Sequence, residues 1–265
     1  MLRLSIALPA YGLHLDIGHA AMWFGLGASM QQASDKIELA SFVEYHINGI
    51  DLCRNTAVWD ALQTPASHLL MVDADTYHRS SGEAIADAGT DIVQMIRDAD
   101  RMATPELQVD GSHKLVPIEP PKLADAYLPL QHTGVAMIAA PVRGRGGKSG
   151  VCVQKLVLER TPAGDIIKRP GEALTLGELT GKVQPVGRIG GAFIVISLDW
   201  LRTHWPDPPW FVMENAYPQG SRPSNARGED YTFCDGIYKR NGLVLCDGRF
   251  VPSHVDRRRL VGEQT

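Results

Sequence analysis

The chain has 265 residues, of which 44% are hydrophobic and 21% are charged, and its formal net charge is −4. This composition is typical of a soluble globular protein with one large α/β domain or two small ones. The negative net charge excludes a general basic character that would draw the whole chain to nucleic acid or to a membrane surface. A local basic patch remains compatible with it.

The four cysteines form no CxxC pair, so neither a zinc knuckle nor a disulfide scaffold is expected. No stretch approaches the roughly 18 consecutive apolar residues of a membrane helix. The apolar run at the N-terminus is too short for a signal peptide. We therefore expect reduced thiols, a cytoplasmic location and no membrane partner.

The hydrophobic pattern alternates between the periods of strands and helices along the chain. Strands are predicted at 4–8, 36–45 (where a helix is the alternative), 69–72, 135–140, 151–159, 192–196 and 243–246. Helices are predicted at 19–32, 50–62, 91–102, 199–204 and 229–241. A turn at 162–165 predicts a hairpin with the residues that follow it.

The apolar residues 69–72 run directly into two aspartates, Asp73 and Asp75. A strand buried on both faces offers a carboxylate no partner in its middle, so both aspartates belong at its C-terminal end. Open α/β sheets bind their ligands at that edge. Two carboxylates there can hold a divalent cation that keeps open positions for phosphate oxygens. An acidic turn that caps the next helix is the alternative.

Two further segments carry candidate ligand contacts. Pro9 ends the first predicted strand, and Ala10 and Tyr11 follow it at the edge where Asp75 lies if the sheet is parallel. Tyr11 has the ring to stack on a ligand base or to pack against its own loop. Arg54, near the start of a helix, has two interpretations: a phosphate contact or a surface salt bridge.

Glycines and carboxylates in the C-terminal half extend the candidate site. Gly190 and Gly191 precede an apolar strand, where they would let a ligand approach the backbone closely. Glu229 and Asp230 open a helix, and the helix macrodipole stabilises carboxylates at that position. The same effect keeps them ionised, as a general base requires.

A basic loop follows the strand predicted at 135–140. It places Arg143, Arg145 and Lys148 among four glycines, which suits the phosphate groups of a nucleotide or of a polynucleotide. The spacing of a P-loop is not met. A surface hairpin is the alternative. A second basic group, formed by three consecutive arginines, Arg257, Arg258 and Arg259, lies near the C-terminus.

Taken in order, these segments resemble the GT-A fold, nucleotide-sugar-dependent glycosyltransferases of the large inverting group, and among them the small phage-type enzymes. The resemblance covers nearly the whole chain and is carried by Pro9-Ala10-Tyr11, Arg54-Asn55, the segment 68–75, the segment 190–193, and Gly228-Glu229-Asp230 with a later His254.

The resemblance implies an α/β, Rossmann-like GT-A fold with a mostly parallel central sheet, flanking helices and a C-terminal elaboration on the acceptor side. It implies a single domain over 1–256 with an elaboration at about 76–132, followed by a basic tail over 257–265. The polymer-synthase motif QxxRW is absent, which favours transfer of one sugar.

The resemblance also implies roles for individual residues. The donor, with a UDP-sugar favoured, would be bound by Pro9, Ala10, Tyr11, Arg54, Asp73, Gly190 and Gly191. A Mn²⁺ or Mg²⁺ ion would be held by Asp75 and His254 together with Asp73, and the imidazole ligand favours Mn²⁺. Asp230 would be the catalytic base, with Glu229 as the less favoured choice.

The acceptor is the most open part of this interpretation. The basic groups favour a polyanion, with a hydroxylated base in phage-type DNA as the specific case, while a glycan, a protein and a small molecule are alternatives. An acidic residue that reads uracil has no clear counterpart, with Glu38 and Glu44 both available. Two other classes of protein compete with this interpretation. One is a nucleotidyltransferase, which would need a cation near Pro9 that this chain lacks, and the other is a non-catalytic nucleic-acid-binding protein.

Overall fold

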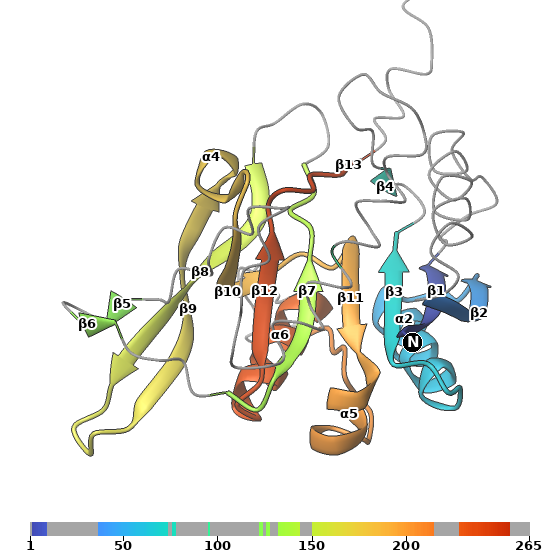
Figure 1. Ribbon diagram of the computed structural model, residues 1–265, viewed down its shortest axis with the longest axis horizontal. Coiled ribbons are helices and arrows are strands. Elements are labelled where there is room, and N and C mark those ends of the chain that lie inside the picture. The colour runs from blue at the N-terminus through green and yellow to red at the C-terminus, as the bar shows by residue number, and fades with distance from the viewer. Residues whose placement is uncertain are drawn as a thin grey trace, which may run out of the picture.

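A nine-stranded sheet forms the centre of the protein, in the strand order β2-β1-β3-β11-β7-β12-β10-β8-β9 (Figure 1). The computed structural model describes residues 2–9, 37–73, 76–77, 95, 122–123, 126–127, 132–143, 150–214 and 228–254.

The nine strands are β1 (Leu2–Pro9), β2 (Ile37–Tyr45), β3 (His68–Val72), β7 (Val135–Ala139), β8 (Gly150–Arg160), β9 (Ile166–Thr175), β10 (Val183–Ile189), β11 (Phe193–Ser197) and β12 (Leu243–Asp247). Two small pairs are β4 (Thr76–Tyr77) with β13 (Ser253–His254), and β5 (Lys122–Leu123) with β6 (Ala126–Tyr127). The described helices are α2 (Ile50–Leu62), α4 (Leu176–Leu179), α5 (Leu198–His204) and α6 (Glu229–Lys239).

The α/β class is confirmed, but the prediction of a mostly parallel sheet is wrong. Only β1–β2, β1–β3 and β7–β12 are parallel pairs, and the other five neighbouring pairs are antiparallel. The β8–β9 connection is a tight turn, in which the Thr161 N–H donates to the Asp165 carbonyl at 2.8 Å. So short a connection cannot make the crossover that parallel strands require.

Strand β11 is the antiparallel strand that most affects the arrangement of the candidate site. It lies between β3 and β7 and runs opposite to both, with Phe193 beside Val72 and Ser197 beside His68. An apolar strand buried on both faces has the same pattern in either direction, so its sequence does not predict its orientation. Because β11 begins where β3 ends, the glycine pair that precedes β11 comes to the edge that holds Asp73.

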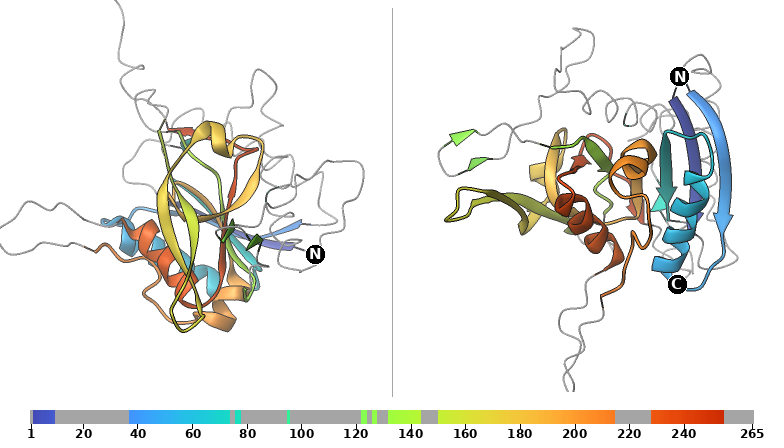
Figure 2. Two further views of the ribbon diagram at one scale, coloured as in Figure 1. Left: turned by 90° about the vertical axis from the view of Figure 1, so that its left-hand side faces the viewer. Right: turned by 90° about the horizontal axis from the view of Figure 1, so that it is seen from below.

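Side chains along the central strands alternate between two apolar clusters, one on each face of the sheet. Leu69 and Met71 of β3 belong to the cluster that includes residues of α2, α5 and α6, and Leu70 and Val72 belong to the other. Figure 2 shows α2 and α6 on the same side of the sheet. With both faces of β3 covered, polar groups are accommodated at its ends.

Most other predicted elements are confirmed to within a few residues, including the strand interpretation of 36–45, the hairpin at 162–165 and helices α2, α5 and α6. The predicted helix at 19–32 lies outside the described residues, as does that at 91–102 apart from Met95. Most of the elaboration at 76–132 and the whole tail at 257–265 also lie outside them, so the domain boundaries stay predictions. None of the described helices has the length and apolar character needed to cross a membrane.

Candidate functional site

Asp73 lies where the sequence places it, directly after β3. Strands β1 and β3 run parallel, with Ala7 beside Met71, so Pro9 and Asp73 share one edge of the sheet. The Asp73 N–H donates to the Ala192 carbonyl at 2.9 Å, which ties this edge to the start of β11. The next turn is closed by the Thr76 N–H, which donates to the Asp73 carbonyl at 2.9 Å. Ala10, Tyr11 and Asp75 lie outside the described residues.

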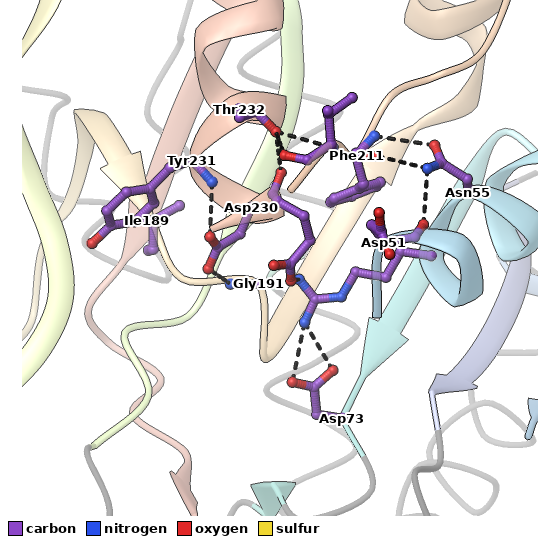
Figure 3. A network of polar contacts seen from close by, with 12 residues as sticks. Asp51, Asn55, Asp73, Ile189, Gly191, Phe211, Asp230, Tyr231 and Thr232 are labelled. Atoms are coloured by element: carbon purple, nitrogen blue, oxygen red, sulfur yellow. Dashed lines mark hydrogen bonds and ion pairs between the residues drawn. The ribbon is translucent and has the colours of Figure 1, made fainter. Parts of the chain in front are cut away.

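Arg54 joins this edge to the start of α6. Its Nη2 donates to both carboxylate oxygens of Asp73, at 3.0 and 3.1 Å, and its Nη1 donates to Glu229 Oε1 at 2.8 Å (Figure 3). Only 2% of the Arg54 side chain is exposed. Arg54 is thus ion-paired, as one of its two interpretations predicts, but the pair is buried and not on the surface.

One guanidinium faces three carboxylates at this point. Burial opposes the charge on Arg54, but Asp73, Glu229 and Asp230 together raise its pKa above the ordinary value, so it stays protonated. Burial raises the pKa of Glu229, and Arg54 opposes this rise while Asp230 adds to it. For Glu229 the ion pair does not cancel the loss of hydration, and the two other nearby carboxylates add to the rise in its pKa. The cluster has more negative than positive groups and is therefore suited to a cationic ligand.

Asp230 is held at the N-terminus of α6 by two backbone amides. The Gly191 N–H donates to Asp230 Oδ2 at 3.0 Å, and the Tyr231 N–H donates to Oδ1 at 2.8 Å. A Cβ on Gly228 would lie 2.6 Å from Oδ1, so the glycine leaves room for this carboxylate. Asp230 is partly exposed whereas Glu229 is buried, and a proton acceptor must be reachable.

The glycine pair does permit a close approach, but the group that approaches Gly191 is a protein side chain. A Cβ on Gly191 would lie 2.1 Å from Arg54 Nη1, and a Cβ on Gly190 would lie 3.2 Å from the Cβ of Cys152. Gly191 therefore makes room for the guanidinium while its N–H holds Asp230. The predicted contact of both glycines with a donor is a separate role and stays a prediction.

Asn55 has a role that the sequence analysis did not assign. Its Oδ1 accepts from the backbone amides of Trp210 and Phe211, at 2.8 and 3.1 Å, and its Nδ2 donates to the Phe211 carbonyl at 2.6 Å. The Phe211 ring lies 5.7 Å from Arg54 Cζ. A partly buried asparagine beside the buried Arg54 needs such partners, which is the signal that could have identified it.

Of the predicted metal ligands, Asp73 and the backbone of His254 are described, whereas Asp75 lies outside the described residues. Strands β4 and β13 are antiparallel, with His254 beside Thr76, the residue that follows Asp75. Near them, the N–H of the exposed Arg143 donates to the Pro252 carbonyl at 3.0 Å. Within the described residues, no group of three His, Cys, Asp or Glu side chains is placed to hold a metal ion.

The remaining predicted basic contacts are not described. Arg145 and Lys148 in the loop, and Arg257, Arg258 and Arg259 near the C-terminus, all lie outside the described residues.

The sequence matches no protein-family model, and no curated protein matches it significantly. Among solved structures, the chain is similar to A197 from STIV, with a TM-score of 0.46 and 10% identity over 96% of this chain and 86% of that chain. GalNAc-T7, crystallised with UDP, GalNAc and Mn²⁺, is similar with a TM-score of 0.41 and 8% identity over 97% of this chain and 44% of that chain. The 4-diphosphocytidyl-2C-methyl-D-erythritol synthase of Anaerococcus prevotii is similar with a TM-score of 0.36 and 7% identity over 96% of this chain and 90% of that chain. At these TM-scores the function has to be argued from the site itself.

Proposed function

We propose that the protein transfers one sugar from a nucleoside-diphosphate sugar to an acceptor hydroxyl, with inversion at the sugar carbon and with the help of a divalent metal. The observation that carries the proposal is the linkage of Asp73 to Glu229 and Asp230 through Arg54 and Gly191. It brings Asp73, at a strand end where a donor can bind, close to Asp230, which is partly exposed and can act as a base.

In this proposal the donor lies along the edge formed by the ends of β1 and β3. Asp73 would contact the ribose and the metal-bound diphosphate, as the family resemblance implies. Pro9 shares that edge, and Ala10 and Tyr11 follow it in the chain. Gly190 and Gly191 precede Ala192, whose carbonyl accepts from the Asp73 N–H, and the donor would approach their backbone there. A UDP-sugar is the favoured donor.

The proposed metal would be held by Asp75 and His254 together with Asp73. The pairing of His254 with Thr76 supports this set, because it places the histidine backbone beside the residue that follows Asp75. When bound, Mn²⁺ or Mg²⁺ would act as a Lewis acid that neutralises the charge on the leaving diphosphate. A mixed oxygen and imidazole donor set favours Mn²⁺ over Mg²⁺.

Asp230 is the proposed base. The acceptor hydroxyl gives its proton to the Asp230 carboxylate while the acceptor oxygen forms a bond to the anomeric carbon. The bond from that carbon to the diphosphate breaks, and the nucleoside diphosphate leaves with the electron pair. Attack from the face opposite the diphosphate inverts the configuration. Glu229 is less suited, because it is buried and paired with Arg54.

The acceptor that we propose is a polyanion, with a hydroxylated base in DNA as the specific case. The exposed Arg143 supports it, because its backbone adjoins the segment that leads to His254. Arg145, Lys148, Arg257, Arg258 and Arg259 would extend the same basic surface. A base within a duplex would have to be flipped out to reach Asp230. Alanine at Arg143, Arg145 and Lys148 should weaken salt-sensitive DNA binding without abolishing donor hydrolysis. Loss of both together, or no DNA binding by the unaltered protein, would remove DNA as the acceptor.

The proposal is tested by a screen of nucleotide sugars for hydrolysis in the presence of Mn²⁺. We expect turnover of at least one nucleotide sugar and its loss on addition of EDTA. Asp230→Asn should retain donor binding and lose roughly 10²–10⁴-fold in rate, because the neutral amide cannot take the proton. Glu229→Gln is the matched control and should lose less. A protein that hydrolyses no nucleotide sugar and binds no nucleoside diphosphate would refute the proposal.

A further inference from the structure

The guanidinium of Arg54 occupies the space between the donor side and the base side of the proposed site. Its two Nη atoms make all three hydrogen bonds to carboxylates: two to Asp73 after β3, and one to Glu229, the first residue of α6. Because Arg54 itself belongs to α2, one rigid planar group fixes the relative positions of three elements. A lysine in its place would offer no such planar fork.

The guanidinium is enclosed by the protein on several sides. The side chain is 2% exposed, and the ring of Phe211 lies 5.7 Å from Cζ. On another side the backbone of Gly191 approaches so closely that a Cβ would lie 2.1 Å from Nη1. The Gly191 N–H in turn donates to Asp230 at 3.0 Å. The position of Arg54 is therefore coupled to the position of Asp230 through two routes, Glu229 and Gly191.

We infer that Arg54 is a positioning residue that sets the spacing between Asp73 and Asp230, and that it does not contact the donor diphosphate. This inference rests on the proposed function, in which Asp73 serves the donor and Asp230 is the base. It replaces the expectation that the guanidinium binds a phosphate, because the side chain is 2% exposed and both of its Nη atoms already donate to carboxylates. Displacement of a reacting group by about 1 Å can lower a rate roughly 10²-fold, so a positioning role has a large kinetic effect.

The first test compares UDP with uridine as probes in calorimetry with Mn²⁺ present, for the wild type, Arg54→Met and Arg54→Lys. A positioning role predicts that Arg54→Met and Arg54→Lys weaken the binding of both ligands and do so to the same extent as each other, because neither side chain offers the planar fork that holds Asp73. It also predicts that the turnover number for hydrolysis of a UDP-sugar falls roughly 10²-fold in both variants. The inference is overturned if UDP alone loses affinity in Arg54→Met and the lysine variant regains it, because that pattern identifies a direct charge contact with the diphosphate.

A second test uses Gly191→Ala to push the guanidinium aside without removing it. Alone, this substitution should lower the turnover number and weaken the binding of uridine, as Arg54→Met does, because it displaces the group that holds Asp73. In the Arg54→Met background the same alanine should cost little more, because the group with which its Cβ collides is gone. Multiplicative losses in the double variant would show two independent roles and overturn the coupling.

The two proposals fail in different ways. If the wild type binds no UDP and hydrolyses no nucleotide sugar, the proposed function fails, and the inference fails with it. If the wild type is active, Arg54→Met loses affinity only for UDP and Arg54→Lys regains it, the proposed function stands and only the positioning role is lost.

Discussion

At the scale of single residues, Arg54 is ion-paired with Asp73 and Glu229 and lies close to Asp230, and its removal would take away the positive charge that these carboxylates share. A carboxyl whose pKa is higher in the folded than in the unfolded state favours folding at acid pH. That contribution is lost as the pH rises through the folded-state pKa. Burial already raises the pKa of Glu229, and Arg54 opposes the rise. Without Arg54 the pKa of Glu229 should rise further.

Arg54→Met should therefore destabilise the protein more at pH 8 than at pH 5. Removal of one partner from a buried ion pair costs about 3–5 kcal/mol. At pH 5 we expect a cost smaller by roughly 1–2 kcal/mol, because protonation of Glu229 relieves the buried charge. Urea unfolding at the two pH values measures the difference.

Arg202→Met is the matched control for this experiment. Arg202 donates to the carbonyls of Ala66 and Thr64, at 2.9 Å each, and carbonyls do not titrate. It also donates to the Leu62 carbonyl at 3.5 Å, and its carboxylate partner, Asp199, is exposed. Arg202→Met should lower the stability by an amount that changes little between pH 5 and pH 8. An equal pH dependence in both variants would contradict the account of Arg54.

The sequence predicts the places of the individual site residues better than their contacts. Asp73 follows from the end of an apolar run, and Glu229 and Asp230 follow from a helix start, because both signals are local. The bond from Arg54 to Glu229 spans 175 residues, and no local pattern contains it. The sequence leaves an arginine on a helix undecided between surface and interior, and only the packing of α2 against the sheet decides it.

At the scale of elements, strand direction was the main error, and it matters for the site. Had β11 run parallel to β3, Gly191 would lie at the opposite edge, far from Asp73. The antiparallel course of β11 brings the N–H of Gly191 to Asp230 and the carbonyl of Ala192 to Asp73. The strands themselves were predictable from their apolar runs, whereas orientation depends on the connections and on neighbours distant in sequence.

The packing of β10 against β8 and β9 gives a test of the architecture. The register between β10 and β8 shifts around Gly187. A Cβ on Gly187 would lie 2.5 Å from the Lys155 carbonyl oxygen and 2.7 Å from the Pro170 Cα, and both are backbone atoms. Gly187→Ala should cost about 1–3 kcal/mol in urea unfolding, because backbone cannot swing aside as a long side chain can.

Gly177→Ala in α4 provides the comparison for Gly187→Ala. A Cβ on Gly177 meets nothing within 4 Å. Alanine there should leave the stability unchanged or raise it by about 0.5–1 kcal/mol, since it reduces the freedom of the unfolded chain. If Gly187→Ala is as well tolerated as Gly177→Ala, the three strands are not packed as described.

At the scale of the whole molecule, the site residues come from distant parts of the chain and converge on one edge of the sheet. The end of β3, the start of β11, the start of α6 and the β4–β13 pair all contribute to it (Figure 1). Both faces of the central sheet are covered by apolar clusters, so this edge is where charged groups can gather. The same arrangement buries three of the four cysteines and leaves one exposed.

Thiol labelling tests this arrangement across the molecule. Cys53, Cys234 and Cys246 are buried, whereas Cys152 is exposed beside Asp230. Burial raises the pKa of Cys53 to about 11 and that of Cys234 to about 12, and it raises the pKa of Cys246 well above its ordinary value. Since the thiolate is the reactive form, these three thiols should stay unreactive while the protein is folded.

With DTNB at pH 8, the native protein should therefore release one equivalent of thionitrobenzoate, and the urea-unfolded protein four. Cys152→Ser should reduce the native signal to zero and the unfolded signal to three. Partial burial and Asp230 raise the pKa of Cys152, so it should react more slowly than free cysteine at the same pH. If occupation of the proposed site by UDP and Mn²⁺ slows the reaction further, the thiol borders that site. Rapid reaction of two or more thiols in the native protein would show that the apolar clusters are not closed around the sheet.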